Sequence, residues 1–228
     1  MAEKGFVSAV IVAAGSSRRM GGVNKLLLKI KGREVLSRTV EAFEKSSDIN
    51  EIIIAARAED IEDFSALLAE YKKIKCIVPG GETRQKSVAA AVAMCSEQSA
   101  MLAIHDGARP LVSQDIISRT VDAAFEFGGA ACGVRVKDTI KVTDSNSLIT
   151  DTPDRSTLWA VHTPQCFDKA MYERCVESLG EKAKDMTDDC RLVEICGGTV
   201  KMIEGSYSNI KITTVEDIPM AESLLGDE

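Results

Sequence analysis

The sequence is short of positive charge. Its 228 residues include 28 lysines and arginines against 35 aspartates and glutamates, which gives a net charge of -7. General nucleic-acid binding requires an extended basic surface, so this composition argues against a nucleic-acid partner. A phosphate site in this chain must instead be a local cluster of cations.

Cysteine pairs with CxxC spacing are absent. The seven cysteines form an odd set, and most of them lie in apolar stretches. This pattern indicates neither a disulfide framework nor a zinc site. We expect the thiols to pack as small hydrophobic groups.

Long apolar runs are missing as well. The first one, Phe6 to Ala14, is too brief for a membrane span or for a signal sequence with its cleavage site. We therefore predict a cytoplasmic protein with no membrane partner. Its length suits one α/β domain of ordinary size, so we predict a single domain over residues 1–228.

What the sequence does have is an alternation of short β-branched runs with segments of helical spacing. This pattern predicts an α/β fold, with a mostly parallel sheet covered by helices. The runs are apolar throughout, as expected for strands buried on both faces. The predicted strands are Ser8–Val12, Glu51–Ala56, Lys75–Val78, Met101–His105 and Ala130–Val134.

The regular pattern breaks after Val134. Two short β-like runs flank the polar turn at 144–146, which predicts a hairpin arm within about 137–160. Such an arm has little core of its own, so we predict a homodimer that buries it. The tail predicts helices at 168–179, from a Thr187 cap and from Val215, with short strands at 200–203 and 210–212.

A loop of small residues with two arginines follows the first predicted strand. It runs from Ala13 to Gly22, and Lys25 comes shortly after it. Small residues let backbone N–H groups approach an anion, while Arg19 and Lys25 supply positive charge for a triphosphate. The loop lacks the spacing of a P-loop or of a dinucleotide fold. An ordinary glycine turn would look similar, but its place at a strand end favours a ligand site.

Two further polar clusters also follow predicted strands. The first, Pro79 to Ser87, opens a helix, and a turn capped by Thr83 or Glu82 would explain it equally well. The second contains Asp106, which is well placed to bind Mg²⁺ or a hydroxyl beside phosphates. We therefore expect polar loops to converge on one edge of the sheet.

Other polar residues have simpler interpretations. His105 is expected to be a structural hydrogen-bonding residue. Lys137 and Arg155 would by default be solvated surface charges. Asp188 and Asp189 would be first-turn residues that favour the helix dipole.

Taken together and in order, these segments resemble the 2-C-methyl-D-erythritol 4-phosphate cytidylyltransferases of the non-mevalonate isoprenoid pathway. The resemblance covers the chain from about Ser8 to Ala221. The segments that carry it are AAGSSRRMG with NK, GGETRQKS, HDGARP, KDTIK, DRSTLWAVHTPQCF, TDD and EGSYSNIKITTVEDI.

The resemblance implies a Rossmann-like nucleotidyltransferase fold with an arm that is exchanged across a homodimer. It implies an enzyme that transfers a cytidylyl group from CTP to 2-C-methyl-D-erythritol 4-phosphate, with Mg²⁺ as cofactor. The products would be 4-diphosphocytidyl-2-C-methyl-D-erythritol and pyrophosphate.

Motif positions also imply roles for individual residues. The triphosphate would be held by Ala13, Ala14, Gly15, Arg19 and Lys25. The cytosine would contact Gly81 and Ser87, and Asp106 would face the metal or the ribose. The acceptor would be bound by Thr139, Arg155 and Thr163, with Arg109, Thr187 and Lys211 completing the site. Of these, Arg19, Lys25 and Lys211 would be catalytic, because they neutralise charge on the reacting phosphates.

Three alternatives remain at this point. A ribitol-5-phosphate cytidylyltransferase would use the same donor on a similar polyol phosphate. A non-catalytic nucleotide-binding regulator would need the loops but not all three catalytic cations. A dehydrogenase would need the dinucleotide fingerprint, which is missing.

Overall fold

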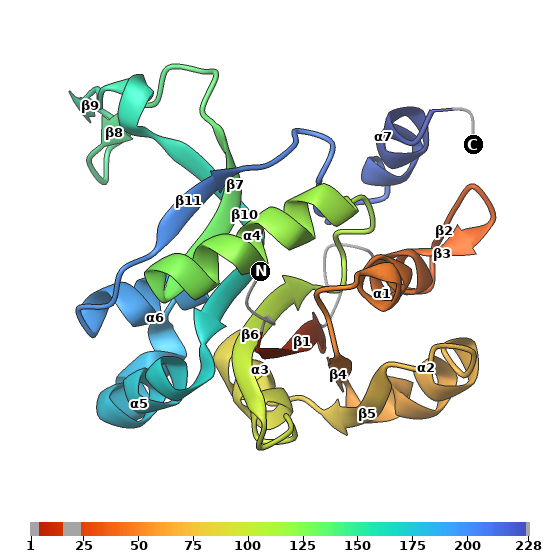
Figure 1. Ribbon diagram of the computed structural model, residues 1–228. Helices are drawn as coiled ribbons and strands as arrows, with labels where there is room; N and C mark the ends of the chain where they lie inside the picture. The colour runs from red at the N-terminus through yellow and green to blue at the C-terminus, as the bar shows by residue number, and fades with distance from the viewer. Residues whose placement is uncertain (1–4, 16–23, 227–228) are drawn as a thin grey trace.

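The computed structural model describes residues 5–15 and 24–226, and a seven-stranded sheet lies at their centre (Figure 1). The strand order is β11-β7-β10-β6-β1-β4-β5. The strands are β1 (Phe6–Ala13), β4 (Glu51–Ala56), β5 (Ile74–Pro79), β6 (Ser99–Asp106), β7 (Gly129–Arg135), β10 (Trp159–Asp168) and β11 (Lys201–Glu204).

The sheet is mostly parallel, as predicted. β1 pairs in parallel with β4 and β6, β4 with β5, and β7 with β11. The carboxyl ends of β1, β5 and β6 therefore meet at one edge, where Val12 is paired with Asp106. The five strands predicted from the sequence are confirmed to within two residues at each end.

β10 was not among the predicted strands. It runs antiparallel between β6 and β7, and its register with β7 shifts between Val161 and Gln165. His162, Thr163 and Pro164 lie inside this irregularity and interrupt the apolar pattern that marks a buried strand. The prediction of a strand at 210–212 was wrong. The backbone N–H of Ile212 donates to the Ala108 carbonyl (2.8 Å), but residues 210–212 form no β-ladder with another strand.

Helices cover both faces of the sheet, and buried residues of a strand alternate between the two cores. In β4, Ile52 and Ile54 belong to one core while Ile53 and Ala55 belong to the other. One core includes residues of α1 (Val35–Lys45), α2 (Ile61–Leu67), α4 (Gln114–Phe127) and α7 (Asp217–Leu224). The other includes residues of α3 (Arg84–Val92), α5 (Lys169–Leu179) and α6 (Asp189–Ile195).

One helix boundary corrects the sequence prediction. α2 ends at Leu67, and the hydroxyl of Tyr71, which lies beyond it, accepts from Arg33. The cap of α6 is Asp188 and not Thr187, because the Asp188 carboxylate accepts the backbone N–H of Arg191 (2.9 Å).

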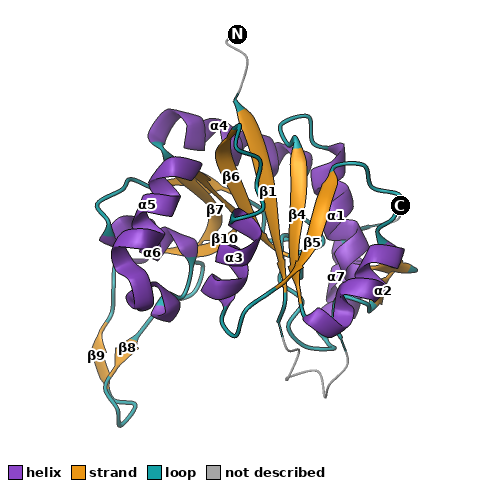
Figure 2. Cartoon of the chain, turned by 90° about the horizontal axis from the view of Figure 1, so that it is seen from below, coloured by secondary structure: helices purple, strands orange, loops and turns teal. Residues whose placement is uncertain are grey.

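The predicted hairpin is present as β8 (Val142–Thr143) and β9 (Ile149–Asp151). It projects from the body of the molecule (Figure 2) and carries exposed apolar side chains, including Leu148 and Ile149. A second small hairpin, β2 (Lys29–Ile30) with β3 (Arg33–Glu34), precedes α1. The 3₁₀ turns are η2 (Ala58–Asp60), η3 (Arg155–Thr157) and η4 (Gly180–Asp185).

Within residues 5–15 and 24–226, none of the helices is long and apolar enough to cross a membrane.

Candidate active site

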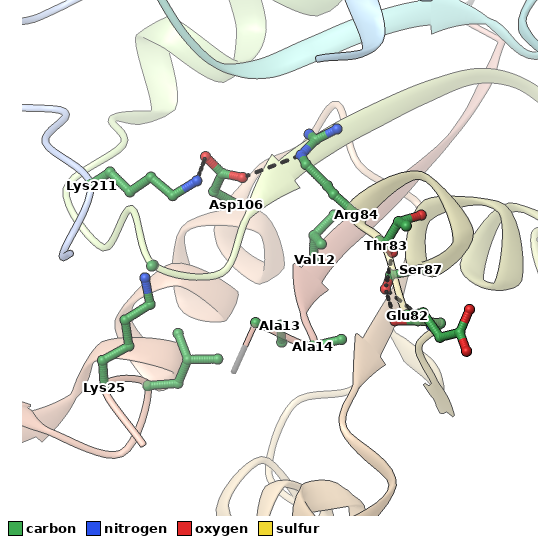
Figure 3. Close-up of a pocket in the computed structure, with 14 residues that line it drawn as sticks. Val12, Ala13, Ala14, Lys25, Glu82, Thr83, Arg84, Ser87, Asp106 and Lys211 are labelled. Atoms are coloured by element: carbon green, nitrogen blue, oxygen red, sulfur yellow. Dashed lines mark hydrogen bonds and ion pairs between the residues drawn. The ribbon is translucent and has the colours of Figure 1, made fainter. Parts of the chain in front are cut away.

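A cavity of about 370 Å³ opens where the carboxyl ends of the parallel strands meet. This is the edge at which open α/β sheets bind ligands. Figure 3 shows that its walls come from the loop after β1, the start of α3, the end of β6 and the segment that holds Lys211. The residues that line it are Val12, Ala13, Ala14, Gly15, Lys25, Leu26, Gly81, Glu82, Thr83, Arg84, Ser87, Asp106, Ala108 and Lys211.

The loop after β1 contributes Ala13, Ala14 and Gly15 to the cavity, as expected. Among the described residues, no heavy atom lies within 4 Å of a Cβ atom placed at Gly15, so these residues leave the space beside its backbone open. Lys25 stands on the same wall, and its ammonium group donates to the carbonyl of Ile212 (2.8 Å). The predicted Arg19 lies outside the described residues.

The loop after β5 is packed tightly around Ser87. Its hydroxyl accepts the N–H of Gly81 (3.1 Å) and donates to the Thr83 carbonyl (2.9 Å). A Cβ atom at Gly80 would come within 2.5 Å of the Ala14 side chain. The loop after β5 therefore packs against the loop after β1 at Gly80. Thr83 is the α3 cap, since it accepts the N–H of Lys86 (3.1 Å). The capping alternative is therefore confirmed for Thr83, and Gly81 and Ser87 still line the cavity.

Three cationic side chains surround the carboxylate of Asp106. Its Oδ2 lies 3.0 Å from Nζ of Lys211 and 3.3 Å from Nε of Arg109, and its Oδ1 lies 3.8 Å from Nε of Arg84. Burial alone would raise the pKa of Asp106, but the charges of Lys211, Arg84 and Arg109 outweigh it and hold the pKa well below its usual range. The carboxylate is therefore ionised at neutral pH.

A buried layer behind Asp106 fixes its position. The backbone N–H of Asp106 donates to Oγ1 of Thr163 (3.0 Å), and this hydroxyl lies 3.0 Å from Nδ1 of His105. His105 Nε2 contacts the carbonyl of Arg109 (3.2 Å), so Nε2 carries the proton and Nδ1 accepts. Burial lowers the pKa of His105 to about 3. His105 thus has the structural surroundings that we expected, while Thr163 and Arg109 support Asp106 without lining the cavity.

Three residues predicted for the acceptor-substrate site do not line this cavity. Thr139 and Arg155 are exposed on the arm, where Arg155 donates to the Lys137 carbonyl (2.7 Å). Thr187 is exposed just before α6. Within one chain, these three residues are therefore not part of the cavity wall around Asp106.

Two residues that contact Asp106 or the residues supporting it were not predicted from the sequence. Arg84 lines the cavity beside Asp106, although the GGETRQKS motif gave no reason to choose it over its neighbours. Asn209 is fully buried; its side chain donates to the Thr163 carbonyl (2.9 Å) and its own carbonyl accepts from Arg109 (2.7 Å). Its position in the EGSYSNIK motif was a usable signal.

Comparison with known proteins shows to which family the chain is similar. The family model for 2-C-methyl-D-erythritol 4-phosphate cytidylyltransferase matches residues 7–227. A protein of that name from Caldanaerobacter subterraneus is 46% identical over 223 residues, which cover 96% of this chain and 98% of the relative. One from Clostridium botulinum is 41% identical, with 96% of both chains covered.

Solved structures agree with the sequence matches. A 4-diphosphocytidyl-2C-methyl-D-erythritol synthase from Anaerococcus prevotii superimposes with a TM-score of 0.89 at 32% identity, covering 98% of this chain and 97% of the other. The 2-C-methyl-D-erythritol 4-phosphate cytidylyltransferase of Thermus thermophilus gives 0.78 at 30% identity, covering 96% and 98%. The fold is thus the Rossmann-like nucleotidyltransferase fold, and this chain belongs to the 2-C-methyl-D-erythritol 4-phosphate cytidylyltransferase family.

Proposed function

We propose that this protein transfers a cytidylyl group from CTP to 2-C-methyl-D-erythritol 4-phosphate in the non-mevalonate isoprenoid pathway. The products are 4-diphosphocytidyl-2-C-methyl-D-erythritol and pyrophosphate. The observation that carries this proposal is the family match over residues 7–227, together with a cavity in which Lys25, Lys211 and Asp106 converge.

The chemistry is an in-line displacement without a covalent enzyme intermediate. A phosphate oxygen of the acceptor forms a bond to the α-phosphorus of CTP, and the bond from that phosphorus to the bridging oxygen of pyrophosphate breaks. Because the attacking phosphate is already ionised at neutral pH, no general base is needed. The main task is to bring two polyanions together and to stabilise the charge that develops at the α-phosphoryl group.

We assign that task to Arg19, Lys25 and Lys211. Lys25 and Lys211 present their ammonium groups to the cavity from two walls (Figure 3). The backbone of Ala13, Ala14 and Gly15 would hold the triphosphate, and Gly81 and Ser87 would contact the cytosine. Asp106, steadied by Thr163 and Arg109, would face the ribose or the metal.

We propose that a magnesium ion enters the cavity carried mainly by the nucleotide. The carboxylates that line it are Asp106 and Glu82, and the Glu82 side chain is largely exposed and paired with Lys86. Mg²⁺ in nucleotide sites commonly uses one or two carboxylates together with substrate phosphates. Asp106 would be its protein ligand, and the ion would neutralise charge on the triphosphate.

We also propose a homodimer formed through the β8–β9 arm. Leu148 and Ile149 are each more than 60% exposed there, which is costly for large apolar side chains in water. Thr139 and Arg155 lie on the same arm and outside the cavity of their own chain. Exchange of arms would bring them to the partner's acceptor site.

The proposed compartment is the cytoplasm. All seven cysteines are free thiols, including the exposed Cys196, and thiols persist in reducing compartments. Cell fractionation that recovered the protein in a secreted or membrane fraction would contradict this assignment.

The deciding experiment measures pyrophosphate release by the purified protein with CTP and Mg²⁺. Methylerythritol phosphate and ribitol 5-phosphate are compared as acceptors. We expect turnover with methylerythritol phosphate alone. Turnover with ribitol 5-phosphate alone would keep the chemistry and change the substrate, and binding of CTP without turnover on either acceptor would favour a regulator.

A further inference from the structure

Arg84 occupies a junction between two carboxylates. It is the first residue of α3, directly after the Thr83 cap. Its Nη1 lies 2.6 Å from Oδ2 of Asp189, and its Nε lies 3.8 Å from Oδ1 of Asp106. Figure 3 shows the side chain leaving the start of α3 and extending toward Asp106 at the cavity wall.

Asp189, the anchor of this arginine, has no exposed surface. Its Oδ1 accepts the hydroxyl of Tyr172 (2.8 Å), and its backbone N–H donates to Oε1 of Gln165 (3.1 Å). Asp189 therefore ties α6 to α5 and β10, and both of its carboxylate oxygens are engaged. It does more than favour the helix dipole, which was the role expected from the sequence.

An ion pair to a fully buried aspartate is an expensive way to stabilise a fold. Removing the aspartate and most of the arginine from water carries a desolvation cost that the attraction between them often fails to recover. The presence of such a pair is better explained if it holds a charged group in a position that function requires. Here the fixed group is a guanidinium whose planar fork faces Asp189 on one side and Asp106 on the other.

Arg84 also adjoins the loop after β5, called the base-side loop here because we propose that it faces the cytosine. Ser87, which follows Arg84 by less than one helical turn, holds Gly81 through its hydroxyl. A second bond, from the Gln85 side chain to the Asp188 carbonyl (3.3 Å), joins the first turn of α3 to the start of α6. A shift of Arg84 would therefore move the base-side loop relative to Asp106.

We propose that Arg84 is a positioning residue for the nucleotide: anchored by Asp189, it holds Asp106 and the loop of Gly81 and Ser87 in one fixed arrangement. This inference rests on the proposed function, in which Asp106 faces the ribose and the loop faces the cytosine. Arg84 then sets how well the enzyme distinguishes CTP from 2′-deoxy-CTP and from UTP.

The test compares kcat and KM for CTP, 2′-deoxy-CTP and UTP in the wild type and in Arg84→Gln, Arg84→Lys and Asp189→Asn. We expect KM for CTP to rise, and the preference for CTP over 2′-deoxy-CTP to fall, each about tenfold, as for loss of one charge-assisted hydrogen bond. Arg84→Lys keeps the charge but cannot face both carboxylates, so it should rescue folding more than nucleotide preference.

Arg33 supplies a matched control. It also contacts a carboxylate, Glu41, and a tyrosine hydroxyl, that of Tyr71 (2.6 Å), but it does not line the cavity. Arg33→Gln should lower the melting temperature and leave KM and nucleotide preference unchanged.

The two proposals fail in different ways. Wild-type protein without turnover on CTP and methylerythritol phosphate would contradict the proposed function. An active wild type whose Arg84 and Asp189 variants keep the same KM and nucleotide preference would overturn the role of Arg84. That result would stand even if the variants yielded less folded protein, because KM does not depend on enzyme concentration.

Discussion

The ammonium group of Lys25 donates a 2.8 Å hydrogen bond to the carbonyl of Ile212, although 187 positions separate the two residues. Ile212 directly follows Lys211, whose own ammonium group lies 3.0 Å from Asp106. The first loop of the chain and its last loop are thus joined at the cavity. Two cations from opposite ends of the sequence therefore line the cavity in which we propose that the triphosphate binds.

Replacing Lys25 tests whether this cation stabilises the transition state. We expect Lys25→Ala to lower kcat by roughly 10²-fold, as when a single preorganised donor is removed from a developing anion. Steady-state pyrophosphate release at saturating CTP measures the effect. A variant that retained nearly full kcat would show that Lys25 is a spectator.

Lys29 provides the control for that experiment. It lies four positions later on β2, its side chain is exposed, and it pairs with Glu34 at 3.4 Å. Lys29→Ala removes the same charge from the same region and should leave kcat within experimental error. Exposed pairs of this kind contribute little to stability, so its melting temperature should also be unchanged.

The strands and the strand-end loops could be predicted because their signals are local. Apolar runs marked β1, β5 and β6, and small or charged residues marked the loops that follow them. β10 could not be found in this way, since Thr163 and Gln165 make it look like a loop. These residues are buried because they bond to His105, Asp189 and Asp106, which lie far away in the sequence.

The same limit applies to Arg84 and Asp189. Each has a sufficient local explanation, as a helical surface charge or as a first-turn acid. Their real environment is created by the hydrogen bonds that join the start of α3 to the start of α6, which neither segment encodes alone. Buried pairs between distant helices are therefore the part of a site that one sequence conceals best.

Replacing Gly15 and replacing Gly80 by alanine should have different effects on the protein. In Gly15→Ala the new Cβ atom meets none of the described atoms within 4 Å, so the melting temperature should stay within a degree or two, whereas KM for CTP rises if phosphates approach this backbone. Gly80→Ala would drive a Cβ atom within 2.5 Å of Ala14 and 2.8 Å of the Ser87 hydroxyl. That variant should lose about 1–3 kcal/mol of unfolding free energy, the usual cost of overpacking.

Thermal melting with and without CTP separates the two glycines. Gly15→Ala should melt like the wild type without CTP and gain less on adding it. A Gly15→Ala protein with unchanged KM would remove the triphosphate from that part of the loop. A Gly80→Ala protein as stable as the wild type would mean that the loops after β1 and β5 do not pack as described.

His105 should make the fold sensitive to mild acid. Burial holds its pKa at about 3 in the folded protein, against an ordinary value of 6.5. Between these values the unfolded chain binds a proton at His105 and the folded chain does not, so stability falls as the pH is lowered below 6.5. This group alone should contribute about 1.4 kcal/mol per pH unit in that window and nothing above it.

Urea unfolding at several pH values, in the wild type and in His105→Gln, isolates this contribution. Glutamine can still accept from Thr163 and donate to the Arg109 carbonyl, but it does not titrate. The variant should show a shallower loss of stability between about pH 6.5 and about pH 5, above the range of ordinary carboxylates. Identical pH slopes would mean that His105 is protonated in the folded state.

The arm provides the last prediction. If Ile149 is buried between two copies of the chain, Ile149→Asp places an unpaired charge in an apolar interface, and the dimer should dissociate. Light scattering should give twice the chain mass of 24.6 kDa for the wild type and 24.6 kDa for the variant. Val215→Asp, at another exposed apolar position, should remain dimeric.

The monomeric Ile149→Asp variant should also differ in its kinetics. Because Arg155 and Thr139 would be withdrawn from the partner's site, its KM for methylerythritol phosphate should rise while its KM for CTP changes little. A wild type that is monomeric at micromolar concentration, yet fully active, would show that each cavity works without a second arm.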